Sequence, residues 1–169
     1  MSLAQLPHTA GCLVCGRDNP HGLQLSLHVD TSIGEVSAEW TPKPEHIGFQ
    51  GIVHGGILAT VLDEAMVWAA TWSGKRFCVC GELNVRYRQS VSVGVPLVIQ
   101  AKIEAVRSRL IEVSGLIRDR SDVIYTATTG KYVPITAERN MQFVQTLIAS
   151  PSSQKTMAAL RPSGATEPS

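Results

Sequence analysis

The chain has 169 residues, of which 44% are hydrophobic, and its formal net charge at pH 7 is +1. This length predicts one domain with some extra chain at its ends, and the hydrophobic share suffices for a sizeable core. A nearly neutral chain gives no reason to expect nucleic acid as a partner, and its start lacks the basic and apolar regions of a secretory signal. We therefore expect a soluble, cytoplasmic protein with no membrane partner.

The first part of the chain predicts an arm followed by a hairpin. Residues 1–22 are polar, contain Gly and Pro at turn positions, and carry Cys12 and Cys15 in a C-x-x-C pattern. Apolar and polar residues then alternate over Leu23–Asp30 and again over Glu35–Trp40. This period is typical of half-buried strands, and the tight link between the two segments favours a hairpin.

A long apolar segment comes next, and the rest of the chain is organised around it. Ile57–Trp72 lacks Gly and Pro and is rich in good helix formers, which predicts one buried helix of roughly four turns. It is too short to span a membrane and carries two acids, Asp63 and Glu64. A carboxylate in a buried helix is costly unless it is paired, hydrated or used. Both acids therefore need an explanation.

Four further strands are predicted after this helix, with short connections between them. They are Phe77–Gln89, Val95–Val106, Leu110–Asp119 and Val123–Pro134. Short connections favour antiparallel neighbours. A lone apolar helix buries most of its faces only against a sheet. We expect an α+β fold in which an antiparallel sheet of about six strands wraps around the central helix.

These predictions divide the chain into four parts. The folded domain spans residues 23–135, after the arm at 1–22. Apolar residues at roughly helical spacing predict a short helix within 136–149. Pro, Ser and small residues dominate 150–169, which predicts a disordered tail.

The entry to the central helix carries the most distinctive local pattern. His54, Gly55 and Gly56 occupy its expected N-terminus, where backbone N–H groups are bare and the helix dipole is positive. Two glycines there would let another group approach these donors closely. Asp63 follows two turns after Gly56, on the same helix face.

At this point the sequence resembles a family. The order of elements and the motif G-I-V-H-G-G-x6-D resemble the hotdog-fold acyl-CoA thioesterases, and most of all their phenylacetate-pathway (PaaI-like) branch. The segments CLVCGRDNPHGLQL and NVRYRQSVSVG also resemble that branch, so the likeness covers about residues 11–135. The resemblance implies a homodimer joined edge to edge, often paired into a tetramer. It also implies active sites at the dimer interface and an acyl-CoA substrate.

Residue roles follow from the resemblance. Asp63 falls on the catalytic acid, which activates water as a general base or attacks the thioester carbonyl itself. Gly55 falls on the oxyanion donor, and the family takes this loop from the other subunit. His54 would orient the loop or bond the substrate. No cofactor and no metal is expected, because coenzyme A enters as part of the substrate.

Four residues are predicted to contact the substrate, and one position departs from the family. The candidate substrate contacts are Gly56, Gln50, Arg86 and Arg88. The two arginines share a strand face, where they are either solvated sheet residues or contacts for the phosphates of coenzyme A. The family often carries Asn or Gln six residues before the motif His, where this chain has Gly48. Gln50, two residues later, is the candidate to take over that polar role.

Other interpretations stay open at the level of sequence. Asp63 could instead be a structural residue paired with Arg86 or Arg88. The pocket could bind acyl-CoA without turnover, or His54 and Asp63 could act together as a dehydratase. Glu64 points about 100° away from Asp63 around a helix and is interpreted as a structural or interface acid.

The four cysteines also allow two interpretations. Cys12 and Cys15 together with Cys78 and Cys80 could ligate zinc, although C-x-C is not the usual spacing of a zinc knuckle. Cys78 and Cys80 also lie in a predicted strand, where they are readily explained as small core residues. We favour the second interpretation.

Overall fold

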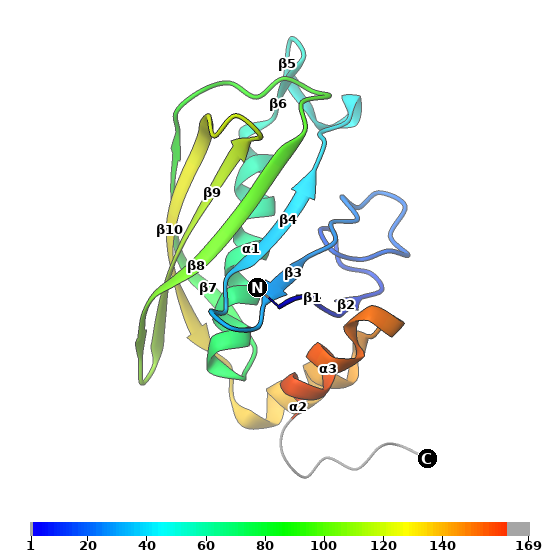
Figure 1. Cartoon of the computed structure of the whole chain (residues 1–169), viewed down its shortest axis with the longest axis vertical. Coiled ribbons are helices and arrows are strands. Elements are labelled where there is room, and N and C mark those ends of the chain that lie inside the picture. Colours follow the sequence, from blue (N-terminus) through cyan, green and yellow to red (C-terminus); the bar gives the residue numbers. More distant parts are fainter. Residues whose placement is uncertain (1, 162–169) are drawn as a thin grey trace.

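The computed structural model describes residues 2–161, and its main element is a single antiparallel sheet. Within these residues the sheet has seven strands in the order β1-β3-β4-β8-β9-β10-β7. In that order they are Leu3–Gln5, His28–Asp30, Val36–Trp40, Leu97–Arg107, Leu110–Asp119, Ile124–Pro134 and Cys78–Tyr87. Figure 1 shows the strands crossing over one long helix, α1 (Gly55–Gly74), which packs against β4 and β7 to β10. The predicted α+β fold, a sheet wrapped around a central helix, is confirmed.

Helix α1 packs closely on the sheet because two strands carry glycines beneath it. A Cβ added at Gly115 on β9 would lie 3.0 Å from the Met66 sulfur, and one at Gly130 on β10 would lie 2.9 Å from the Met66 methyl. Met66 itself is fully buried. The glycines thus make room for a large side chain at the centre of the core, where volume changes of one methylene are costly.

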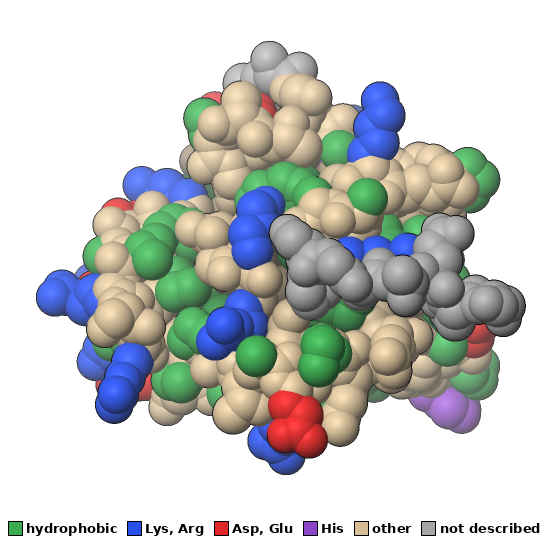
Figure 2. Space-filling model, turned by 90° about the horizontal axis from the view of Figure 1, so that it is seen from below, with side chains coloured by type: hydrophobic (Ala, Val, Ile, Leu, Met, Phe, Trp, Pro, Cys, Tyr) green, Lys and Arg blue, Asp and Glu red, His purple; other side chains and the backbone are tan. Residues whose placement is uncertain are grey.

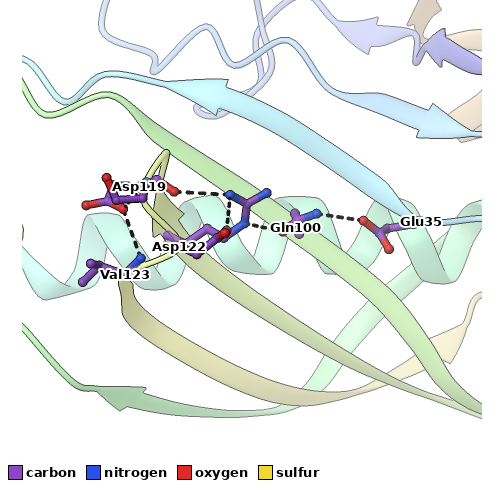
Figure 3. Close-up of polar contacts among 7 residues, drawn as sticks. Glu35, Gln100, Asp119, Asp122 and Val123 are labelled. Atoms are coloured by element: carbon purple, nitrogen blue, oxygen red, sulfur yellow. Dashed lines mark hydrogen bonds and ion pairs between the residues drawn. The ribbon is translucent and has the colours of Figure 1, made fainter.

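The long strands form because their apolar residues alternate toward the helix. Along β8, Leu97, Ile99 and Ala101 are buried, whereas Gln100 lies on the other face. Figure 3 shows what that outer face holds: the Gln100 amide donates to Glu35 (3.0 Å) and accepts from Arg118 Nε (2.9 Å). Arg118 also forms an ion pair with Asp122 at 2.8 Å. Polar side chains thus connect β8 and β9 with the residue that precedes β4, on the side of the sheet away from the core.

A small hairpin precedes the helix and was not predicted. Its strands are β5 (Ile47–Phe49) and β6 (Ile52–Val53), after a short helical turn, η1, at Pro44–His46. The two turn residues, Gln50 and Gly51, both have positive φ, at 41° and 80°. A two-residue turn with positive φ at both positions matches the twist of paired strands.

The N-terminal segment is more structured than the predicted arm. Strand β1 pairs with β3 and supplies the seventh strand of the sheet, while β2 (His8–Thr9) pairs with β11 (Leu147–Ile148). The strand predicted at Leu23–Asp30 is wrong in its first half, because only His28–Asp30 belongs to the sheet. Gln24 has a φ of 52°, which breaks the extended geometry.

The C-terminal segment also departs from expectation. Within 136–149 the structure has helix α2 (Ala137–Gln145) and then β11. The disorder predicted from residue 150 is wrong for 151–160, which form a short helical turn, η2 (Pro151–Ser153), and helix α3 (Gln154–Leu160). Thr156 donates a hydrogen bond to the Gln5 carbonyl oxygen at 2.5 Å, so this segment packs on the N-terminal one. The rest of the predicted tail, 162–169, lies outside the described residues.

Surface composition at this end of the molecule is mixed. Figure 2, viewed from below, shows hydrophobic side chains exposed between lysine and arginine side chains. Within residues 2–161, no helix has both the length and the apolar character needed to cross a membrane.

Candidate functional site

The N-terminus of α1 is closed by its own histidine. His54 is the N-cap residue, and its Nδ1 accepts a hydrogen bond from the Gly56 N–H at 2.9 Å. Because Nδ1 is the acceptor, a neutral His54 carries its proton on Nε2, and the His54 side chain is exposed. A Cβ at Gly56 would lie 2.9 Å from Nδ1, so a side chain at this position would crowd the cap.

Gly55 presents a backbone N–H at the first turn of α1. No acceptor for this N–H is found among residues 2–161. The Gly55 carbonyl oxygen accepts a hydrogen bond from the Tyr87 hydroxyl at 2.9 Å, and a Cβ at Gly55 would lie 3.3 Å from the Tyr87 ring. A bare N–H at the positive end of a helix dipole is suited to binding an oxyanion.

Gly48 stands where the resembling family often carries Asn or Gln, and the structure gives a steric reason for the glycine. A Cβ at this position would lie 2.8 Å from the His54 Cα and 2.9 Å from its Cβ. His54 therefore packs directly against the backbone of Gly48, which leaves no room for an Asn or Gln side chain. Gln50 lies at the tip of the β5–β6 hairpin with an exposed side chain.

Asp63 has a specific partner that the sequence did not reveal. The hydroxyl of Tyr132 on β10 donates a hydrogen bond to Oδ1 of Asp63 at 2.8 Å. Tyr132 is fully buried, whereas Asp63 is half-buried. Burial, and then the negative charge of Asp63, raise the pKa of Tyr132 far above its usual range, so the hydroxyl stays a donor. No ion pair of Asp63 with Arg86 or Arg88 is found in the described part of the chain.

Cys80 is a second neighbour of Asp63. A bulge at Gly81 leaves Cys80 opposite Tyr132 in the β7–β10 register. Burial and the nearby Asp63 carboxylate raise the pKa of the Cys80 thiol. The Asp63 carboxylate thus has the Tyr132 phenol and the Cys80 thiol as neighbours, and Cys80 belongs to β7, the last strand in the sheet order.

One chain does not bring Asp63 and Gly55 together. They are eight residues apart on one straight helix, a separation of about 12 Å at a rise of about 1.5 Å per residue. A single carbonyl group cannot contact both at that distance. The two groups can act on one carbonyl group only if each comes from a different chain.

A surface cavity lies beside the helix entry. Its volume is about 340 Å³, and it lies between the helix entry and the end of β7. Its lining residues are Ile52, Val53, Gly55, Leu58, Tyr87, Arg88, Gln89, Ser90 and Val91. Of the residues predicted from the sequence, Gly55 and Arg88 line this cavity; Asp63, His54, Gly56, Gln50 and Arg86 do not.

The two cysteine pairs do not meet. Cys78 is buried and its N–H donates to the Thr71 hydroxyl at 3.3 Å, while Cys80 lies beside Asp63. The described residues therefore do not form a zinc site that combines both cysteine pairs. Cys12 and Cys15 instead lie against Glu64 of α1, with all three ligand atoms within 4.8 Å of one another.

Glu64, the second helix acid, is half-buried like Asp63. Its Oε1 accepts a hydrogen bond from the Trp68 indole N–H at 3.0 Å. Burial, and then the charge of Cys12, raise the pKa of Glu64 to about 7. Hydrogen bonding to Cys15 and to backbone N–H groups lowers the pKa of Cys12, and the same contact raises that of Cys15. The cluster of Cys12, Cys15 and Glu64 shares no hydrogen bond with Asp63 among the described residues.

Comparison with known proteins matches part of the chain to one family. Residues 50–126 match the family model described as thioesterase superfamily. The chain is 28% identical over 120 residues to the acyl-coenzyme A thioesterase THEM4 of Xenopus laevis, covering 68% of this chain and 51% of that protein. The chain spans about half the length of the curated relatives it matches.

Solved structures share the fold. A crystal structure of a thioesterase superfamily protein is 27% identical, with a TM-score of 0.68, and the match covers 72% of this chain and 62% of that one. The phenylacetic acid degradation protein PaaI of Thermus thermophilus is 19% identical, with a TM-score of 0.61, covering 67% of this chain and 95% of that one. This second likeness concerns the fold alone.

Proposed function

We propose that this chain is a hotdog-fold thioesterase that hydrolyses an acyl-CoA thioester to a free acid and coenzyme A. The match of residues 50–126 to the thioesterase superfamily model and the sheet wrapped around α1 support this proposal. The observation that carries the proposal is the Asp63 carboxylate, held by the Tyr132 hydroxyl at 2.8 Å on the largely apolar helix α1. Partial burial of a carboxylate costs free energy, and the Tyr132 contact fixes its orientation. A carboxylate in such a place is expected to take part in chemistry.

The proposed reaction needs few groups. Asp63 takes a proton from water, and the water oxygen bonds to the thioester carbonyl carbon. The carbonyl oxygen becomes an oxyanion that the Gly55 N–H stabilises. The carbon–sulfur bond then breaks, and the thiolate leaves and takes up the proton from Asp63. Direct attack by Asp63, with water hydrolysing the resulting anhydride, would yield the same products.

We propose that two chains build each site, with Asp63 from one and Gly55 from the other. The separation of these residues along α1 supports this, and so does the position of β7 at the end of the sheet order. Strand β7 has ten residues and exposes Val79 and Tyr87, at 48% and 51%. A long edge strand with exposed apolar residues favours pairing with a second chain. The resulting homodimer could pair again into a tetramer.

The remaining predicted residues have supporting roles in this proposal. His54 and Gly56 shape the helix entry, and Arg88, at the cavity, meets the phosphates of coenzyme A. Arg86 and Gln50 are proposed as further substrate contacts on exposed positions. The chemistry uses water, a carboxylate and a backbone N–H, so no cofactor is part of it. We also propose a cytoplasmic location, where reducing conditions keep closely spaced thiols free.

The test is to incubate the purified chain with short, long, aromatic and β-hydroxyacyl-CoAs and to measure free thiol and enoyl absorbance together. Thiol release at a rate above the uncatalysed one supports the proposal and identifies the acyl class. Saturable binding without thiol release would make the chain an acyl-CoA carrier. Enoyl absorbance from a β-hydroxyacyl-CoA without thiol release would make it a dehydratase. Both of these outcomes overturn hydrolysis.

A further inference from the structure

A group of possible metal ligands lies outside the Asp63 site. Cys12 Sγ is 3.9 Å from Glu64 Oε1 and 4.0 Å from Glu64 Oε2, and Cys15 Sγ completes a set within 4.8 Å. Two ligands come from the N-terminal segment, and the third comes from the central helix 52 residues later in the chain.

The turn that carries the two cysteines directs N–H groups at sulfur. The backbone N–H groups of Val14 and Cys15 donate to Cys12 Sγ at 3.3 and 3.5 Å. These donors favour the thiolate, which is the form that binds metals. A Cβ at Gly16 would lie 2.4 Å from the Cys12 carbonyl oxygen and 2.5 Å from that of Ala10, so the turn requires a glycine here. The turn is thus specifically built around the Cys12 sulfur.

The spacing of the ligand atoms suits a tetrahedral zinc ion. Zinc lies about 2.3 Å from sulfur and about 2.1 Å from oxygen, so two tetrahedral ligands are about 3.6 to 3.8 Å apart. The observed distances of 3.9 and 4.0 Å exceed this by a few tenths of an ångström. The pairs that involve Cys15 Sγ lie within 4.8 Å, so a contraction of up to about 1 Å would bring the three atoms to ligand distance, with a fourth position left for water.

Charge gives an independent reason for a cation. Glu64 accepts hydrogen bonds from the Trp68 indole and from the thiols of Cys12 and Cys15, and among residues 2–161 no lysine or arginine forms an ion pair with it. Burial and the two neighbouring sulfurs make the ionised form of Glu64 costly without a positive partner, and for that reason its pKa is raised to about 7. A divalent ion would supply that charge.

We propose that Cys12, Cys15 and Glu64 bind one zinc ion, which fixes the N-terminal segment to helix α1. Thiolate ligands select zinc over magnesium or calcium. Binding releases the thiol protons and transfers no electrons. The ion has a structural role in this proposal, and the hydrolysis above does not depend on it.

The test uses the full-length chain, reduced, incubated with zinc and dialysed. We expect one zinc per chain by elemental analysis. We also expect Cys12→Ser, Cys15→Ser and Glu64→Gln each to weaken zinc binding by more than the roughly 10- to 100-fold typical of losing an outer-shell partner. The matched control, Cys80→Ser, removes a cysteine outside the group and should keep the zinc.

A second readout uses cobalt in place of zinc and does not depend on activity. Wild type should show thiolate-to-cobalt charge-transfer absorption, which Glu64→Gln should reduce while circular dichroism shows an intact fold. Wild type that holds no zinc under these conditions would overturn the proposal. So would wild type that is isolated with a Cys12–Cys15 disulfide and still binds no zinc after that disulfide is reduced. So would equal zinc binding by wild type and a folded Cys12→Ser variant.

Discussion

The hydroxyl of Tyr132 lies 2.8 Å from Oδ1 of Asp63, and the two residues come from opposite layers of the fold, the sheet and the central helix. The contact fixes one carboxylate oxygen and leaves the other available. Because Tyr132 is fully buried, this orientation is set by the core and not by solvent. The core packing beneath α1 thereby determines where the proposed base points.

Removing this hydroxyl should affect turnover more than binding. We expect Tyr132→Phe to lower kcat by about 10- to 100-fold, since hydrogen bonds to charged groups contribute about 1.5–3 kcal/mol, with little change in KM. Steady-state thiol release measures both constants. Tyr125→Phe is the matched control, because its hydroxyl also contacts a carboxylate, Asp119, at 3.2 Å. An unchanged kcat in Tyr132→Phe would show that the contact does not position the base.

The His54 cap can be separated from any direct contact with substrate. His54→Ala removes the acceptor for the Gly56 N–H and should lower the free energy of unfolding by about 1 kcal/mol. His54→Asn replaces it with a favoured capping side chain, so stability should return. Denaturant unfolding and thiol release are measured on both. If activity returns with stability, His54 acts as a cap; activity lost in both variants despite restored stability would indicate a direct role.

Gly56→Ala tests the same cap from the other side. Alanine is favoured over glycine in a helix by about 1 kcal/mol, so stability would rise if only propensity mattered. We expect a loss instead, because the new Cβ would lie 2.9 Å from His54 Nδ1. Thermal unfolding gives the sign of the change. Gly11→Ala, with nothing within 4 Å of its Cβ, is the control; a stabilised Gly56→Ala would refute the crowding.

The hydrogen bonds of Gln100 on the outer face of the sheet should contribute to the stability of the fold and not to catalysis. Gln100→Ala removes hydrogen bonds to Glu35 and Arg118, and we expect the free energy of unfolding to fall by about 1–2 kcal/mol. Gln142→Ala, on the exposed surface of α2, should have little effect. Urea unfolding compares the two variants. Equal stabilities would mean that solvent replaces the Gln100 contacts at no net cost.

The sequence was most informative where periodicity was long and regular. The segment Ile57–Trp72 lies within the observed helix, and the four long strands after it appear close to their predicted bounds. The alternation in Leu23–Leu27 was misleading because these residues pair with the N-terminal segment outside the sheet, as in the Leu25 N–H to Val14 carbonyl bond. Local patterns cannot distinguish these two kinds of pairing.

The parts of the site that sequence reasoning missed depend on contacts between distant residues. Tyr132 is 69 residues from Asp63, and its place in an alternating strand looks like an ordinary core position. Cys12 is 52 residues from Glu64, and the C-x-x-C spacing gave no reason to choose a helix acid over the second cysteine pair. Gly48 departs from the family pattern because His54 packs against it across the β5–β6 hairpin. The sequence carries no clear signal for that hairpin, so this cause could not be predicted.

The most direct test of the proposed hydrolysis is kcat for Asp63→Asn, measured by thiol release on the best acyl-CoA found for wild type. Asparagine keeps the shape and can still accept from Tyr132, but it cannot take a proton from water. With an unchanged circular dichroism spectrum, we expect kcat to fall by about 100- to 10,000-fold, the range of general-base catalysis. A folded Asp63→Asn variant that turns over at the wild-type rate would contradict the assignment of Asp63 as the catalytic carboxylate.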